Sequence, residues 1–141
     1  MPNRPPRVVV LHSAEVQHLP QGERLRAQVR LERPSRGFFV GVAELGDRQG
    51  ATSPVGDLRC SARAALDALQ QAVAGTTPVQ LDLHDVQTFE AFGEQAVMVR
   101  VSVTIEQQTR TLMGFCPVGR DPPKAAARAV LSATNRLLGV G

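Results

Sequence analysis

Three histidines and two cysteines are the side chains best suited to bind a metal ion or to attack a substrate. His12, His18 and His84 are not spaced as a metal-binding pair, and the chain contains no Cys-x-x-Cys motif or glycine-rich phosphate loop. Cys60 and Cys116 fall at non-equivalent places, so we expect reduced thiols and no disulfide. The sequence predicts no metal centre, no cofactor and no enzyme. Catalysis by Cys116 or His84 ranks below the two binding functions considered next.

Small-molecule binding is the first of these functions, and its candidate residues lie where two loops meet two helices. The segment 46–57 is the longest break in the first half of the chain, and its counterpart at 117–123 is shorter. Hydroxyl groups and free backbone N–H groups at a helix start bind anions. Helix capping and a solvated surface insertion explain the same residues. The candidate ligand-binding residues are Thr52, Ser53, Val55, Asp57, Gly119 and Asp121.

Nucleic-acid binding is the alternative function. The formal charge of +3 is spread over 16 basic and 13 acidic residues. Arg24, Arg26 and Arg30 alternate with apolar residues along one expected strand, so they are predicted to face solvent and, with the arm Arg4–Arg7, to contact phosphates. The chain has no tyrosine or tryptophan for stacking on bases, only five phenylalanines. The balanced charge and the missing aromatic types favour small-molecule binding.

The candidate ligand-binding residues and the candidate phosphate-binding arginines of the expected strand lie within a unit that occurs twice in the chain. The pattern Ala-Arg-Ala-x-Leu-x-Ala at 62–68 recurs at 127–133. The alternating apolar residues at 25–31 correspond to those at 97–103. The segments 39–42 and 112–115 also correspond, and each has a glycine at its third position, Gly41 and Gly114. Such duplication indicates an internal pseudo-symmetry before any fold is assigned.

The fold expected from this duplication is α+β, a tandem duplication of a β-β-β-α unit with six strands and two helices packed on the sheet face. A flexible arm, 1–6, is expected before a single domain, 7–141, made of repeats 7–75 and 78–139. Asp57 and Asp121 are expected helix N-caps, and Gln107-Gln108 is the expected turn of the last hairpin. We expect strands at 7–16, 23–32, 38–45, 79–89, 95–106 and 109–116, and helices at 57–74 and 122–138.

The expected outer strand faces of the two halves differ in polarity. Arginines line this face in the first half, whereas Ala96 and Met98 make it less polar in the second. Large exposed apolar patches are unusual on monomers, and duplicated units pair readily through a two-fold axis. The sequence therefore predicts a homodimer. The N-terminal segment is rich in proline and arginine without a long apolar stretch, so we expect a soluble cytoplasmic protein with no membrane contact.

Two segments of the chain resemble one protein family in their succession of strand, loop and helix. A strand pair ending in Gly114 leads through a short loop to the helical segment 121–137, and in the first half Ser53-Pro54-Val55-Gly56-Asp57 precedes the other helix. These segments resemble the C-terminal regulatory domain of 2-isopropylmalate synthases, whose loop reads Gly-Pro-Val-Asp-Ala. Gly56 departs from that loop, which continues directly to its acidic residue.

The resemblance implies a tandem of β-rich units with helices that dimerises and binds leucine between subunits near these loops. The chain shows no counterpart of the barrel that performs that family's chemistry. The function implied is a non-enzymatic dimerisation or regulatory module that binds a small metabolite at the loop-to-helix junctions.

Overall fold

The computed structural model describes residues 9–20, 24–34, 36–46, 51, 53–74 and 78–138, with side chains as far as residue 135. The predicted arm, Arg4–Arg7 and Thr52 lie outside these residues. The order of elements confirms the α+β class and the duplicated β-β-β-α unit. The elements are β1 (Val10–Leu19), β2 (Arg24–Arg33), β3 (Gly37–Leu45), α1 (Gly56–Val73), β4 (Val79–Ala91), β5 (Glu94–Ile105), β6 (Gln108–Pro117) and α2 (Pro122–Leu138).

The strands form two separate antiparallel sheets, one from each repeat. Sheet A has the order β1-β2-β3, and sheet B has the order β4-β5-β6. In β2 the residues from Leu25 to Leu31 alternate between buried and exposed, and in β5 the valines from Val97 to Val103 are buried. Because successive side chains of a strand point to opposite faces, each sheet has one core face and one outer face.

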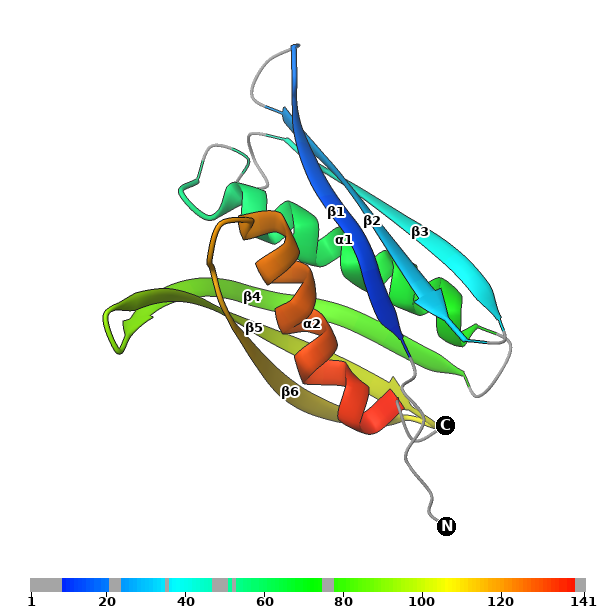
Figure 1. The fold of residues 1–141 in the computed structure, drawn as a ribbon. Coiled ribbons are helices and arrows are strands. Elements are labelled where there is room, and N and C mark those ends of the chain that lie inside the picture. Colours follow the sequence, from blue (N-terminus) through cyan, green and yellow to red (C-terminus); the bar gives the residue numbers. More distant parts are fainter. Residues whose placement is uncertain are drawn as a thin grey trace.

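Both helices lie between the two sheets (Figure 1). α1 packs on β2 and β3 and also touches β4, whereas α2 packs on β5 and β6 and also touches β1. The helices contact each other along the middle of the molecule. The apolar residues of α1 recur at helical spacing and are buried: Leu58, Ala62, Ala65, Leu66, Leu69 and Val73.

Gly41 and Gly114 show how the two repeats correspond. Gly41 pairs with Val29 in sheet A, and Gly114 pairs with Val99 in sheet B. The match of 25–31 with 97–103 in the sequence was therefore two residues out of step. A shift by two residues leaves the same face of a strand buried, so the apolar pattern alone does not reveal it.

The first strand of each repeat contains the same irregularity. His12 in β1 and His84 in β4 have no partner in the ladder, because the register shifts at each of them, so each forms a β-bulge. The sequences around them are Leu-His-Ser-Ala at 11–14 and Leu-His-Asp-Val at 83–86. This further echo of the duplication was missed in the sequence.

The start of α1 differs from its prediction. Val55 occupies the N-cap position and makes no side-chain cap hydrogen bond, so the prediction of Asp57 as the cap is wrong. The helix begins earlier, and Asp57 lies in its first turn, where a negative charge is favourable near the positive end of the helix dipole. Asp121 is confirmed as the cap of α2, since its Oδ1 accepts a hydrogen bond from the N–H of Lys124 at 3.2 Å.

The last hairpin turns at Glu106-Gln107, one residue before the predicted Gln107-Gln108. Glu106 and Gln107 have φ values of 53° and 69°, as a two-residue type I′ turn requires. Phe92 and Gly93 make the turn between β4 and β5, with φ values of 54° and 79°. Both hairpins of sheet B are therefore tight, and the second fixes the register of β6 on β5.

Candidate functional site

The two loop-to-helix junctions predicted to bind a ligand lie at the same end of the helix pair (Figure 1). Ser61 of α1 donates a hydrogen bond from Oγ to the carbonyl oxygen of Pro123, in the first turn of α2, at 2.7 Å. Ser61 is fully buried. The structure therefore brings the described residues of the two predicted junctions to neighbouring places.

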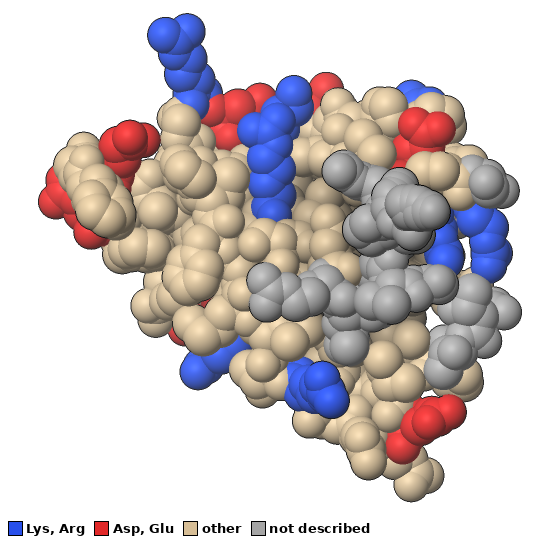
Figure 2. Space-filling model, turned by 60° about the horizontal axis from the view of Figure 1, so that its bottom comes forward, with Lys and Arg blue, Asp and Glu red and all other residues tan. Residues whose placement is uncertain are grey.

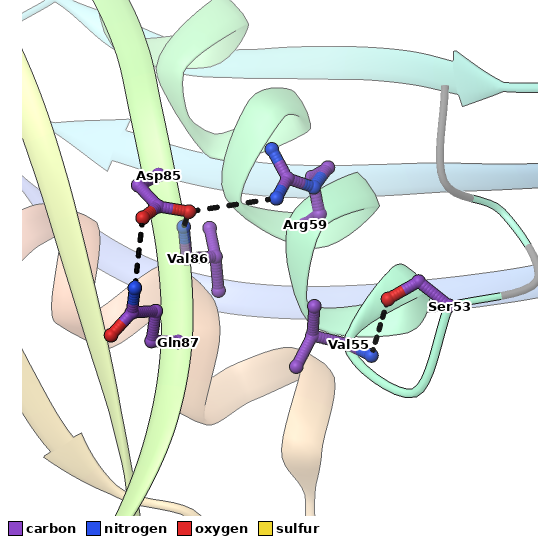
Figure 3. A network of polar contacts seen from close by, with 6 residues as sticks. All are labelled: Ser53, Val55, Arg59, Asp85, Val86 and Gln87. Carbon is purple, nitrogen blue, oxygen red and sulfur yellow. Dashed lines mark hydrogen bonds and ion pairs between the residues drawn. The ribbon is translucent and has the colours of Figure 1, made fainter. Parts of the chain in front are cut away.

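The polar groups of these junctions form contacts within the chain. Ser53 Oγ accepts a hydrogen bond from the N–H of Val55 at 3.2 Å (Figure 3). Asp57 Oδ1 lies 3.7 Å from Nε2 of His18 in β1. Gly119 has a φ of 63° and makes an exposed turn before α2. These contacts favour turn formation and helix-end stabilisation over ligand binding for the predicted residues.

A polar contact that the sequence did not reveal joins α1 to β4 (Figure 3). Arg59 Nη2 lies 3.6 Å from Oδ1 of Asp85, next to the bulge of β4. The Asp85 carboxylate also accepts hydrogen bonds from the N–H of Val86 at 2.9 Å and from Nε2 of Gln87 at 3.0 Å. The ion pair is partly exposed, so it contributes little stability, but it connects the start of α1 with the rim of sheet B.

A cleft of about 280 Å³ lies between α1 and β4. Gln70 of α1 holds β4 there: its Nε2 donates to the carbonyl oxygen of Val79, and its Oε1 accepts from the N–H of Leu81 at 3.0 Å. Among the described residues, the cleft contains no polar side-chain atom that is buried without a partner. The cleft is lined by Arg63, Leu66, Asp67, Gln70, Leu81, Asp82 and Leu83.

The outer face of sheet B carries exposed apolar side chains. Phe89, Met113 and Phe115 are 37%, 49% and 51% exposed. The rings of Phe89 and Phe115 meet edge to face with their centroids 6.0 Å apart. Ala96 and Met98, which the sequence placed on this face, are half-buried between the flanking strands. We call Phe89, Ala96, Met98, Met113 and Phe115 the outer apolar patch.

Charged groups border this patch beside Met113, where Arg100 is paired with Met113 and Asp85 is paired with Arg100. Seen from the side on which sheet B lies, uncharged side chains cover most of the described surface, and basic side chains stand apart from one another (Figure 2). A depression of about 150 Å³ borders the patch and is lined by Asp85, Gln87, Met98, Arg100 and Met113. The patch is therefore apolar at its centre and polar at one rim.

The outer face of sheet A is mixed in charge. Arg24, Arg26 and Arg30 are exposed, as predicted. Arg24 Nη2 pairs with Oε1 of Glu44 at 2.8 Å. The guanidinium carbon of Arg30 lies 4.3 Å from the ring centroid of Phe38, within the range of a cation–π contact. Two of the three arginines thus have partners within the sheet, an arrangement that does not favour phosphate binding on this face.

Both cysteines are free thiols. Burial raises the pKa of the Cys60 thiol to about 11, and this group donates a hydrogen bond to the carbonyl oxygen of Ala43 at 3.4 Å. Burial also raises the pKa of Cys116, partly opposed by the positive charge of Arg128. Both thiols are therefore protonated near neutral pH, which disfavours nucleophilic chemistry.

The described residues contain no group of three or more histidine, cysteine or acidic side chains placed to hold a metal ion. In the same part of the chain, no helix is both long enough and apolar enough to cross a membrane. No protein-family model and no curated protein sequence matches the chain. The resemblance to the 2-isopropylmalate synthase regulatory domain therefore stays a prediction.

Proposed function

We propose that the protein is a non-enzymatic module that pairs with a second copy of itself, and that sheet B forms the contact. The observation that carries this proposal is the exposure of Met113 and Phe115, at 49% and 51%, beside Phe89 on one face. Exposed apolar patches with polar rims mark interaction sites on soluble proteins. Methionine and phenylalanine are also enriched in the buried centres of protein interfaces.

The comparison of the two repeats supports this assignment to sheet B. Met113 and Phe115 occupy the positions that Val40 and Val42 occupy in sheet A, given the pairing of the two central strands. At these two positions the larger apolar side chains therefore belong to sheet B. Self-association is also the role that the resemblance to the synthase regulatory domain implies, and a two-fold pair is the commonest assembly of identical chains.

Binding of a small metabolite at the loop-to-helix junctions stays a prediction. The ion pair between Arg59 and Asp85 connects the first junction with the rim of the outer apolar patch. A thermal-shift screen with amino acids, oxo acids and nucleotides tests this role, because a ligand at about a hundred times its dissociation constant adds roughly 2.7 kcal/mol. Oligonucleotides at low salt in the same screen test the alternative function.

Light scattering coupled to gel filtration tests the pairing at micromolar concentration. We expect twice the chain mass of 15.1 kDa for the natural protein. Phe115→Ser should shift the distribution toward the monomer, because it removes a large exposed apolar side chain from sheet B. Val42→Ser is the matched control at the equivalent position of sheet A and should leave the dimer intact. A monomeric natural protein would contradict the proposal.

A further inference from the structure

Each sheet has two edge strands, and three of the four are protected against pairing with another strand. At the edge of β3, Asp67 Oδ2 of α1 accepts a hydrogen bond from the N–H of Val42 at 3.0 Å. Gln71 Nε2, one turn later, donates to the carbonyl oxygen of Val40 at 2.8 Å. α1 thus occupies backbone groups that a further strand would need.

The first strands of the two sheets are protected differently. Both β1 and β4 are interrupted by a bulge, at His12 and His84, and bulges twist an edge away from regular pairing. At β4, Gln70 in addition bonds the carbonyl oxygen of Val79 and the N–H of Leu81.

β6 has neither form of protection in the described part of the chain. Its ladder with β5 runs without a register shift from Pro117 to Gln108. The helix position equivalent to Asp67 is Ser132, because Ala64 and Ala129 take equivalent places against Gly41 and Gly114. Ser132 is exposed, and its short side chain makes no hydrogen bond to Phe115, the equivalent of Val42. The N–H of Phe115 is therefore open where the N–H of Val42 is closed.

The backbone groups on this edge follow from the hairpin geometry. Glu106-Gln107 is a two-residue turn, so Ile105 and Gln108 form a hydrogen-bonded pair and the pairing alternates from there. The N–H and C=O groups of every second residue then point away from β5. These residues are Thr109, Thr111, Met113 and Phe115.

We propose that β6 pairs antiparallel with β6 of a second copy, joining the two B sheets into one sheet of six strands. This inference rests on the proposed self-association and specifies its seam. A two-fold register centred on Leu112 places Thr111 opposite Met113 of the second copy and Thr109 opposite Phe115. It uses the whole open edge and stops short of Pro117, which has no N–H to donate.

The sequence of β6 suits a second copy of the same strand. Arg110, the only charged residue of β6, lies opposite Gly114 of the second copy in this register, so like charges do not meet. Met113 and Phe115, the most exposed members of the outer apolar patch, lie on the seam strand itself. Pairing brings them beside threonine methyl groups of the second copy, which lowers their exposure.

Two substitutions test the seam by separate routes, each read as the dimer dissociation constant from light scattering. Thr111→Pro removes an edge N–H and leaves the ladder with β5 intact; its control, Thr111→Val, keeps the N–H. Ser132→Asp supplies the carboxylate that Asp67 supplies to β3; its control is Ser132→Ala. We expect both test variants to weaken the dimer at least about tenfold, because the two-fold doubles each lost hydrogen bond, and both controls to leave it unchanged.

Hydrogen exchange on the natural protein gives a reading that does not depend on any variant folding. The edge amides from Thr109 to Phe115 should exchange slowly in the dimer and faster on dilution. Val42→Ser, on the outer face of sheet A, should leave these amides as slow as in the natural protein. A dimer that resists both test variants and exchanges these amides rapidly overturns the seam and keeps the proposed function. A monomer at all concentrations overturns both.

Discussion

Gly41 and Gly114 hold equivalent positions in the two repeats, and at each of them a helix backbone lies where a side chain would otherwise stand. A Cβ atom on Gly41 would fall 2.0 Å from the carbonyl oxygen of Ala64, and one on Gly114 would fall 1.9 Å from that of Ala129. The two glycines therefore set the distance between strand and helix in each half.

Gly41→Ala and Gly114→Ala are each expected to lower the free energy of unfolding by about 3 kcal/mol or more, because the obstructing atoms are backbone and the helix must move. Urea denaturation measures this. Gly119→Ala is the comparison, since its Cβ would meet no atom within 4 Å and only the positive φ of 63° is unfavourable. Its cost should stay near 1 kcal/mol. Equal costs at Gly41 and Gly119 would show that the close approach is not what matters.

Phe92→Asn is expected to stabilise the protein. Phe92 has a φ of 54° and a fully exposed ring, so it adopts a conformation unfavourable for a bulky residue and gains nothing from burial. Asn followed by Gly is the preferred pair for this turn. The gain should be about 1 kcal/mol in urea denaturation. Phe92→Ala removes the ring without easing the backbone and should change little. A loss of stability in both variants would mean that the ring has a partner.

Stability should fall between pH 9 and pH 11 because of Cys60. The pKa of Cys60 is about 11 in the folded protein, above the ordinary value of 9.0. As the pH rises, the thiol therefore loses its proton more readily in the unfolded chain, which favours unfolding. Below pH 9 the full contribution of Cys60 to the free energy of unfolding is present. Near pH 10.5 about 2 kcal/mol of this contribution has been lost. The chain has no tyrosine and a single lysine, Lys124, so few other groups titrate there.

Urea denaturation of the natural protein and of Cys60→Ala at about pH 8 and about pH 10.5 measures this effect. The variant should be less stable at the lower pH, because it loses the thiol's packing, and should show a smaller fall with pH. If the two proteins lose the same stability, the Cys60 thiol is not the group responsible.

Ser61→Ala is expected to weaken the contact between the helix starts. Ser61 is fully buried and donates to the carbonyl oxygen of Pro123 at 2.7 Å, so its removal deletes a buried hydrogen bond between the two helices. A cost of about 1–3 kcal/mol should appear in urea denaturation. Ser132→Ala, at an exposed position of α2, should change stability by less than about 0.5 kcal/mol. A neutral Ser61→Ala would mean that the hydrogen bond contributes no net stability.

The repeats and the buried faces were predictable because they depend on local periodicity. Alternation from Leu25 to Leu31 is the same signal whatever the strand packs against, and it predicted the buried face of β2. Asp121 was found because Pro122 marks the first helical position beside it. Asp57 was misassigned because Ser53, Gly56 and Asp57 are all acceptable helix-start residues, and the contacts of the first turn decide among them.

The candidate site was less predictable. Ser53 and Val55 were correctly placed beside a helix start, but the sequence does not show that Ser53 bonds the chain itself. Arg59 and Asp85 are separated by a helix, a loop and part of a strand, and each reads as an ordinary solvated charge. The echo around His12 and His84 was the one signal that marked the irregular place in β4 where Asp85 lies.

The sequence by itself determined the order of strands and helices, the duplication and the faces that are buried, because each of these depends on residue patterns that span only a few positions. Only the tertiary structure decided which strand edges are closed. Asp67, Gln70 and Gln71 are polar residues of a helix, and their sequence gives no sign of a strand partner. They reach the edges of β3 and β4 because α1 lies between the two sheets, and contacts such as Asp67 with Val42, 25 residues apart, depend on that packing.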